Sequence, residues 1–137
     1  MVRVSLTGMA GFLALTLAGT SGGGAQTVVV ETSVNGGSSV TLHLHPFLMP
    51  EELATLRLVA TNDQALSLFV TSRTGHAALA VSPEEGFVRE GKPAASAVAL
   101  SDLPDAESAR AAVLAGCDAA RKAASPCVVV LEVAPKS

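Results

Sequence analysis

Hydrophobic and polar residues alternate along residues 27–34 and again along residues 40–45, which is the pattern of strands that bury one face. The aliphatic residues that share a face are Val28, Val30 and Val34 in the first run and Val40, Leu42 and Leu44, expected to point inward, in the second. Asn35-Gly36-Gly37 separates the runs and tolerates the positive φ angles of a tight turn. The pattern therefore predicts a β-hairpin that Pro46 ends.

A helical spacing of apolar residues follows at residues 50–60. Its apolar face consists of Leu53, Leu56 and Ala60. Pro50 suits the first helical position, and the carboxylates of Glu51 and Glu52 meet the positive end of the helix dipole. We expect a short helix that Asn62-Asp63 closes.

Residues 64–70 are compatible with two structures. Leu66, Leu68 and Val70 recur with the period of a strand, whereas Asn62-Asp63 can also cap another helical turn. We predict a strand.

The next segment contains three short apolar runs separated by turn residues. Residues 77–81, 87–89 and 95–100 read as strands, and residues 83–86 and 91–93 read as turns. We expect these strands to follow one another as a meander.

The C-terminal part predicts one long helix and one strand. The helix spans residues 105–123, with Asp105 as its N-cap because its carboxylate can accept hydrogen bonds from the first turn. Its predicted buried stripe consists of Ala106, Ala109, Val113, Cys117 and Ala120. Ser125-Pro126 breaks the chain, and Cys127 opens an apolar strand over residues 128–133.

Cys117 and Cys127 are the two cysteines of the chain, and the helix-break-strand spacing brings their backbones together. We predict a disulfide between them, worth about 2.5–3 kcal/mol for a closed loop of about ten residues. The predicted fold class is α+β: an antiparallel sheet with one long C-terminal helix packed on one face and tied to the last strand.

The N-terminus resembles an export signal. Arg3 precedes an apolar run over residues 6–19, and Ala25 follows Gly23 at the spacing of a signal-peptidase site. The alternative is a membrane anchor, but the run is shorter than the roughly 20 residues that a membrane span needs. We expect a signal peptide at residues 1–25, no membrane span after cleavage, and a periplasmic or secreted protein.

The remaining 112 residues suit a single domain with one core. We divide residues 26–137 into an N-terminal hairpin and short helix, residues 26–74, and a strand-helix-strand unit, residues 75–133. Without Arg3 the domain has 8 basic and 12 acidic side chains, a net charge of −4. It lacks a basic stripe and has few aromatic residues, so we expect no nucleic-acid partner.

The second half of the chain resembles a widespread family of small secreted bacterial domains of unknown function. The residues that carry the resemblance are residues 77–82, a turn ending at Gly86, residues 106–109, Cys117, and Cys127 with the valines that follow it. The family pattern implies a core and a disulfide, and no chemistry. Similar short chains are sometimes named 5-aminolevulinate synthase, but that enzyme holds pyridoxal phosphate in a much larger fold, which 112 residues do not form.

Histidines are the candidate metal ligands. His43 and His45 project from the same face of a strand, and with His76 they could hold zinc or copper. The alternative is a pair of solvated histidines on the polar face of an edge hairpin. We expect no bound metal.

Catalytic patterns are not apparent in the sequence. The chain has no nucleophile-elbow motif, and the cysteine spacing differs from that of redox-active pairs, which favours a structural disulfide. The pairs Glu51-Glu52 and Glu84-Glu85 read as a helix start and a turn. We expect no cofactor and no enzymatic activity. The expected function is a binding or structural module whose partner is another envelope protein. A metal-binding protein is the alternative, and an enzyme comes third.

Overall fold

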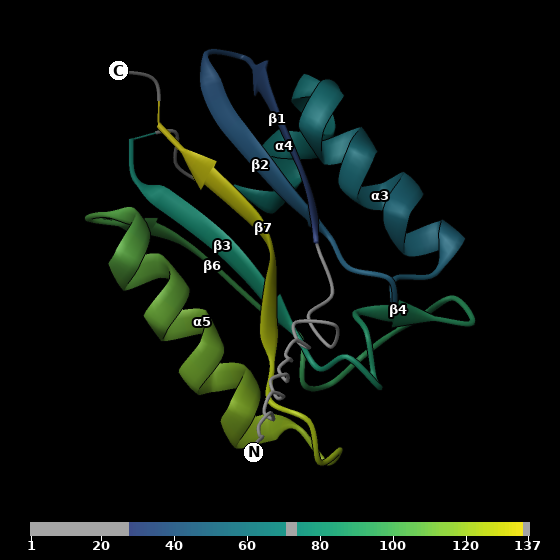
Figure 1. The fold of residues 1–137 in the computed structure, drawn as a ribbon. Coiled ribbons are helices and arrows are strands. Elements are labelled where there is room, and N and C mark those ends of the chain that lie inside the picture. The colour runs from purple at the N-terminus through teal and green to yellow at the C-terminus, as the bar shows by residue number, and fades with distance from the viewer. Residues whose placement is uncertain (1–27, 71–73, 136–137) are drawn as a thin grey trace, which may run out of the picture.

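The computed structural model describes residues 28–70 and 74–135. Five antiparallel strands form the main sheet in the order β1-β2-β7-β3-β6 (Figure 1). The elements are β1 (Val29–Asn35), β2 (Ser38–Leu44), α3 (Pro50–Thr61), α4 (Asp63–Phe69), β3 (His76–Val81), β4 (Val88–Arg89), β5 (Lys92–Pro93), β6 (Val98–Leu103), α5 (Ala106–Ala120) and β7 (Val128–Ala134). The predicted signal peptide lies outside the described residues.

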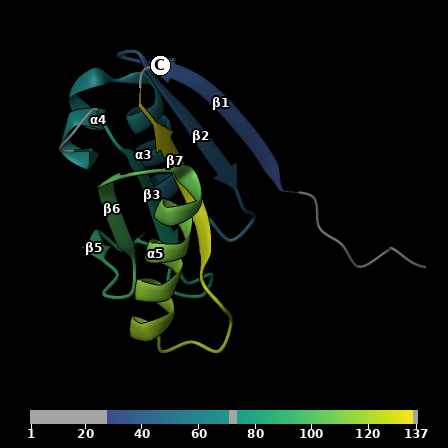
Figure 2. The ribbon, with the colours of Figure 1, turned by 90° about the vertical axis from the view of Figure 1, so that its left-hand side faces the viewer.

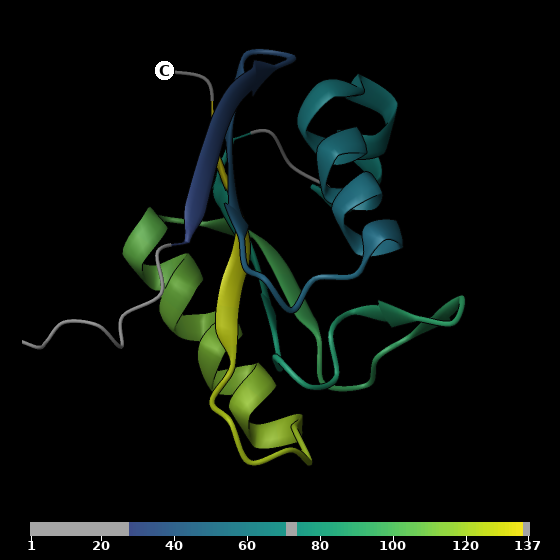
Figure 3. The ribbon, with the colours of Figure 1, turned by 45° about the vertical axis from the view of Figure 1, so that its right-hand side comes forward.

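The sheet separates two helical layers. Figure 3 views the sheet nearly edge-on, with α5 on one side and α3 and α4 on the other. The larger apolar core lies under α3 and α4, and a smaller one built on Ala78, Ala80 and the disulfide lies under α5. The predicted α+β class is therefore confirmed. Within the described ranges, each helix is too short or too polar to cross a membrane.

The N-terminal hairpin forms as the alternation predicts. Asn35 pairs with Ser38, and Gly36 and Gly37 both have positive φ, at 60° and 86°, as a two-residue turn requires. Val40 and Leu42 are completely or almost completely buried. The first strand differs: Val30 and Val34 are 53% and 75% exposed, because β1 lies at the edge of the sheet, beyond the strands on which α5 packs.

The strand predicted at residues 64–70 is wrong, because this segment forms helix α4. The Asn62 side chain accepts a hydrogen bond from the backbone N–H of Ala65 at 2.9 Å and caps the new helix. Leu66 and Val70, four residues apart, are buried, while Leu68 is 88% exposed. A strand would have placed all three on one face, so the helical period decides the segment.

The predicted meander is also wrong. Both sides of β3 are occupied by longer strands, β7 and β6, and β4 instead pairs with β5 in a small separate hairpin. Residues 77–81 of β3 are all buried, so the backbone of this strand needs partners along its whole length. The long strands β6 and β7 supply them, whereas β4 has two residues and could not. The predicted strand 95–100 begins later, at Val98.

Helix α5 begins as predicted and ends earlier. Asp105 accepts a hydrogen bond from the Ser108 N–H at 2.7 Å, and Ala109, Val113 and Cys117 are buried. The stripe is narrower than predicted because Ala106 is half-buried and Ala120 is exposed. Figure 2 shows α5 in front of β3, β6 and β7, on which it packs.

Candidate functional site

An apolar groove of about 410 Å³ opens on the sheet face that carries α3 and α4. Its lining comes from both helices and from strands β3, β4, β6 and β7. We call it the apolar groove, and its residues are Thr55, Leu56, Leu58, Val59, Ala65, Leu68, Phe69, Leu79, Phe87, Val88, Ala99 and Leu131. This set contains no charged side chain.

The groove exists because the helices cover only part of their sheet face. Helix α3 packs on β1 and β2, at one side of the sheet, and leaves the β3–β6 side to other elements. Leu79 of β3 and Ala99 of β6 contribute to the lining there, and the small Ala99 side chain leaves space above the sheet. Leu58 and Leu68 are 53% and 88% exposed, so apolar surface continues to solvent.

Within residues 28–70 and 74–135, the groove offers a ligand no free polar side-chain group. Its one polar side chain is Thr55, and that hydroxyl donates to the Glu51 carbonyl at 2.9 Å. A polar ligand group placed there would lose its hydrogen bonds to water without replacement. Among the described residues the lining holds no nucleophile paired with a base, and its apolar side chains suit an apolar ligand.

Glu52 holds one wall of the groove in place. Its completely buried carboxylate accepts hydrogen bonds from the N–H groups of Met49, Phe87 and Val88 at 2.9, 2.7 and 3.0 Å, and from Arg89 Nε at 3.2 Å. Burial by itself would raise the pKa of this carboxyl, but the four donors lower it below its ordinary value. Helix α3 and the β4 hairpin are thereby joined, which positions Phe87 and Val88.

Gly86 is part of the same arrangement. It has a positive φ of 64°, and a Cβ at this position would collide with the Glu52 carboxylate. From the sequence, Glu52 is predicted to serve the helix dipole, and its contacts with Phe87 and Val88 are not predicted. The available signal was a carboxylate at the third helical position, where it can accept a hydrogen bond from the N-cap N–H, as Glu52 does from Met49.

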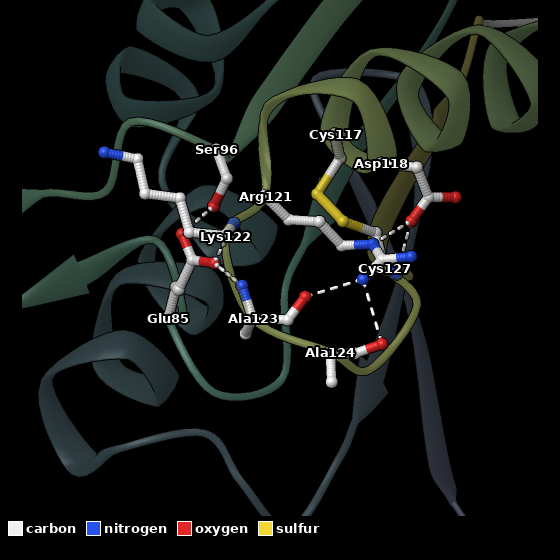
Figure 4. The surroundings of a disulfide bond; sticks show 9 residues. All are labelled: Glu85, Ser96, Cys117, Asp118, Arg121, Lys122, Ala123, Ala124 and Cys127. Atoms are coloured by element: carbon white, nitrogen blue, oxygen red, sulfur yellow. Dashed lines mark hydrogen bonds and ion pairs between the residues drawn. A yellow bond between two sulfur atoms is a disulfide. The ribbon is translucent and has the colours of Figure 1, made fainter.

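Glu85 anchors the same β3–β6 connection to the end of α5. Its carboxylate accepts from the Ser96 hydroxyl at 2.7 Å and from the N–H groups of Lys122 and Ala123 at 2.9 and 3.0 Å (Figure 4). The Ser96 hydroxyl, followed by these N–H groups, lowers the pKa of the Glu85 carboxyl. The β3–β6 connection is therefore held to α3 by Glu52 and to the end of α5 by Glu85. The sequence predicted neither role.

The predicted disulfide joins Cys117 of α5 to Cys127, which precedes β7. The Asp118 carboxylate accepts from the Cys127 N–H and from Arg121 Nε, both at 2.9 Å (Figure 4). Arg121 Nη1 in turn donates to the carbonyls of Ala123 and Ala124. Cys117 is completely buried and Cys127 is 6% exposed. This bond is part of the fold and lies on the sheet face opposite the apolar groove.

His43 is part of a hydrogen-bonded cluster with Glu132 and Arg110 on the α5 side of the sheet. Its Nε2 lies 2.7 Å from Glu132, and Glu132 also accepts from Arg110 Nη1 at 2.7 Å. Burial would raise the pKa of the Glu132 carboxyl, but Arg110 and His43 lower it. The β1–β2 hairpin forms one edge of the sheet, as expected, through β1. Strand β2 itself is internal, between β1 and β7, so His43 is half-buried there instead of fully solvated. Glu132 lies 89 residues from His43 in the chain, so no local sequence pattern predicts this contact.

His45 and His76 have other surroundings. The His45 ring stacks on Phe47 and lies 3.3 Å from the Val129 carbonyl oxygen, and burial is the main cause of its lowered pKa. His76 precedes Ala77, which shares a row of the sheet with Val133 and Val40. His76, one residue before Ala77, is therefore level with Ser39 of β2. His43 lies four residues further along β2, which is roughly 13 Å along the strand. Across residues 28–70 and 74–135, no group of three potential metal ligands comes together.

No protein-family model, curated protein or solved structure matches the chain. The resemblance to a family of small secreted domains therefore stays a prediction.

Proposed function

We propose that this chain is a non-catalytic binding module of the cell envelope and that the apolar groove holds an acyl chain of an amphiphilic ligand. The observation that carries the proposal is the lining of the groove, which has no charged side chain and one hydroxyl that is already hydrogen-bonded. The volume of about 410 Å³ falls in the range of small-molecule sites. The location rests on the predicted signal peptide, and the disulfide fits an oxidising compartment.

An acyl chain fits the groove better than an extended peptide. A peptide would bring backbone N–H and C=O groups against apolar side chains, where they would lack partners. An acyl chain carries no such groups, and its polar head can stay in water because the groove is open beside the exposed side chains of Leu58 and Leu68.

The wall of the groove that contains Phe87 and Val88 also favours binding. Glu52 fixes Phe87 and Val88 through backbone hydrogen bonds, so these lining residues are held in place without a ligand. A preformed groove avoids part of the entropy cost of binding.

The test is a titration of the mature protein with dansylaminoundecanoic acid, followed by its fluorescence, with dodecanoic acid as the competitor. We expect saturable binding that dodecanoic acid displaces. Replacement Ala99→Phe fills the groove above β6 and should weaken binding at least tenfold. The matched control is Ala119→Phe, at an exposed position of α5 on the opposite sheet face, which should bind like the wild type.

Circular dichroism melting of both variants shows whether each one is folded. A wild-type protein that does not bind the probe would overturn the proposal. Equal probe affinity in Ala99→Phe and wild type would show that the probe binds elsewhere and would equally overturn it.

A further inference from the structure

Strand β1 has a free backbone edge. In the described part of the chain its single sheet neighbour is β2. The two-residue turn makes Asn35 and Ser38 a hydrogen-bonded pair, and such pairs alternate with non-hydrogen-bonded ones along the hairpin. The N–H and C=O groups of Val30, Thr32 and Val34 therefore point away from β2, to the outside of the sheet.

The two edges of the sheet differ in how they are protected. Strand β6, at the other edge, is interrupted by a register shift opposite His76 and Ala78 and contains Asp102 with a φ of 67°. Such irregularities are ways in which proteins prevent edge pairing. Strand β1 keeps a regular register with β2 over its whole length and has neither lysine nor proline. It also presents two exposed valines, Val30 and Val34, on one face.

The sequence of β1 is self-complementary about Thr32. If two copies of the strand run antiparallel with Thr32 opposite Thr32, Val30 of one copy stands opposite Val34 of the second copy. The three outward-facing residues of each copy then form hydrogen-bonded pairs, which gives six N–H···O=C bonds. The same register brings β-branched side chains together on one face, a favourable cross-strand pairing.

Charge and space allow this pairing. Glu31 is the one charged residue of β1 and would face Ser33 of the second copy, so like charges do not stand opposite each other. A cleft of about 440 Å³ lies between β1 and α3, lined in part by Arg57 and Ser33. Arg57 bonds Glu31 at 3.2 Å and remains 54% exposed, which leaves a cation beside the position that Glu31 of the second copy would reach.

The opposite sheet face is also accessible. Helix α5 packs on β3, β6 and β7 and leaves β1 uncovered, as Figure 2 shows. We propose that β1 is a self-association edge: two copies of this chain pair their β1 strands about a twofold axis at Thr32 and join two five-stranded sheets into one. This proposal is independent of the apolar groove, which lies on other strands.

The first experiment is sedimentation velocity of the mature protein over a concentration series. We expect a reversible monomer–dimer equilibrium. Replacement Thr32→Pro removes an outward N–H and leaves the β1–β2 hydrogen bonds intact, and proline is tolerated on edge strands in this orientation. It should raise the dimer dissociation constant at least tenfold. Val34→Lys tests the same edge without a backbone change and should have a similar effect.

The matched control is Leu68→Lys, an exposed aliphatic residue on α4, which should leave the dimer unchanged. A wild-type protein that remains monomeric at every concentration would overturn the proposal. Equal weakening by Leu68→Lys and Val34→Lys would assign the contact to another surface and would overturn it as well.

A cysteine pair tests the register. Thr32→Cys places two thiols on hydrogen-bonded partners about 5.5 Å apart between Cα atoms, within the range of a disulfide. Oxidation should therefore yield a covalent dimer. Val29→Cys is the control, because in this register the two copies of residue 29 lie about six residues, roughly 20 Å, apart along the strands. Cross-linking of Val29→Cys at the rate of Thr32→Cys would refute the Thr32 register.

Discussion

Replacing Glu52 by glutamine should cost a large part of the stability of this domain. Oε1 accepts from the Met49 N–H and Arg89 Nε, and Oε2 accepts from the Phe87 and Val88 N–H groups. Whichever way the amide is turned, its NH₂ group faces two of these donors, so two hydrogen bonds to a charged acceptor are lost. Each is worth about 1.5–3 kcal/mol, and we expect a loss of about 3–5 kcal/mol in the free energy of unfolding.

The assay is urea unfolding at pH 7, followed by far-UV circular dichroism. The control is Glu51→Gln, a neighbouring exposed carboxylate with one backbone contact, to the Glu90 N–H at 3.3 Å. We expect this control to lose less than about 1 kcal/mol. If Glu52→Gln loses no more than Glu51→Gln, the assigned role of the buried carboxylate is refuted.

The pH dependence provides a second readout of the same group. The folded-state pKa of Glu52 lies below its ordinary value of 4.5, so its carboxylate contributes stability above that pH. This contribution is lost as the pH falls from 4.5 through the folded pKa. Wild type should therefore lose stability more steeply in acid than Glu52→Gln. Parallel stability curves for the two proteins below pH 4.5 would contradict the lowered pKa.

Three further predictions concern the disulfide, the signal and the histidines. Reduction of the Cys117–Cys127 bond should lower the free energy of unfolding by about 2.8 kcal/mol, measured by urea unfolding with and without reductant; free thiols in periplasmic material would contradict the pairing. Intact-mass measurement of exported protein should show cleavage after Ala25, and a membrane-bound species that retains the segment would favour an anchor. Zinc at 100-fold excess over a dissociation constant would add about 2.7 kcal/mol, a shift of several degrees. We expect no such shift of the melting temperature in the wild type. A wild-type shift that disappears when His43 and His45 are both changed to glutamine would establish metal binding.

Local signals determined the parts of the fold in which neighbouring residues decide the backbone. The Gly36-Gly37 turn, the Asp105 cap and the apolar spacing of α5 depend on contacts a few residues apart, and all three are confirmed. The disulfide was predictable for a related reason, since a short break after α5 leaves the two cysteines close together.

Residues 64–70 show where local signals become insufficient. The spacing of Leu66 and Val70 is compatible with both a strand and a helix. Leu68 supports a strand only if its side chain is buried on the same face as theirs. Burial depends on what packs over the segment, and in the folded chain Leu68 faces solvent. The Asn62 cap was the sequence signal that favoured the helix.

The sequence by itself determined the α+β class, the hairpin, the capped helix and the disulfide, because each follows from periodicity or from residues close together in the chain. The tertiary structure alone decided the strand order, the apolar groove and the role of Glu52. The groove combines residues from both halves of the chain, and Glu52 meets its partners Phe87 and Val88 across 35 and 36 residues. A carboxylate at a helix start is ordinarily solvated, and its function changed here because packing removed the water and supplied backbone donors in its place.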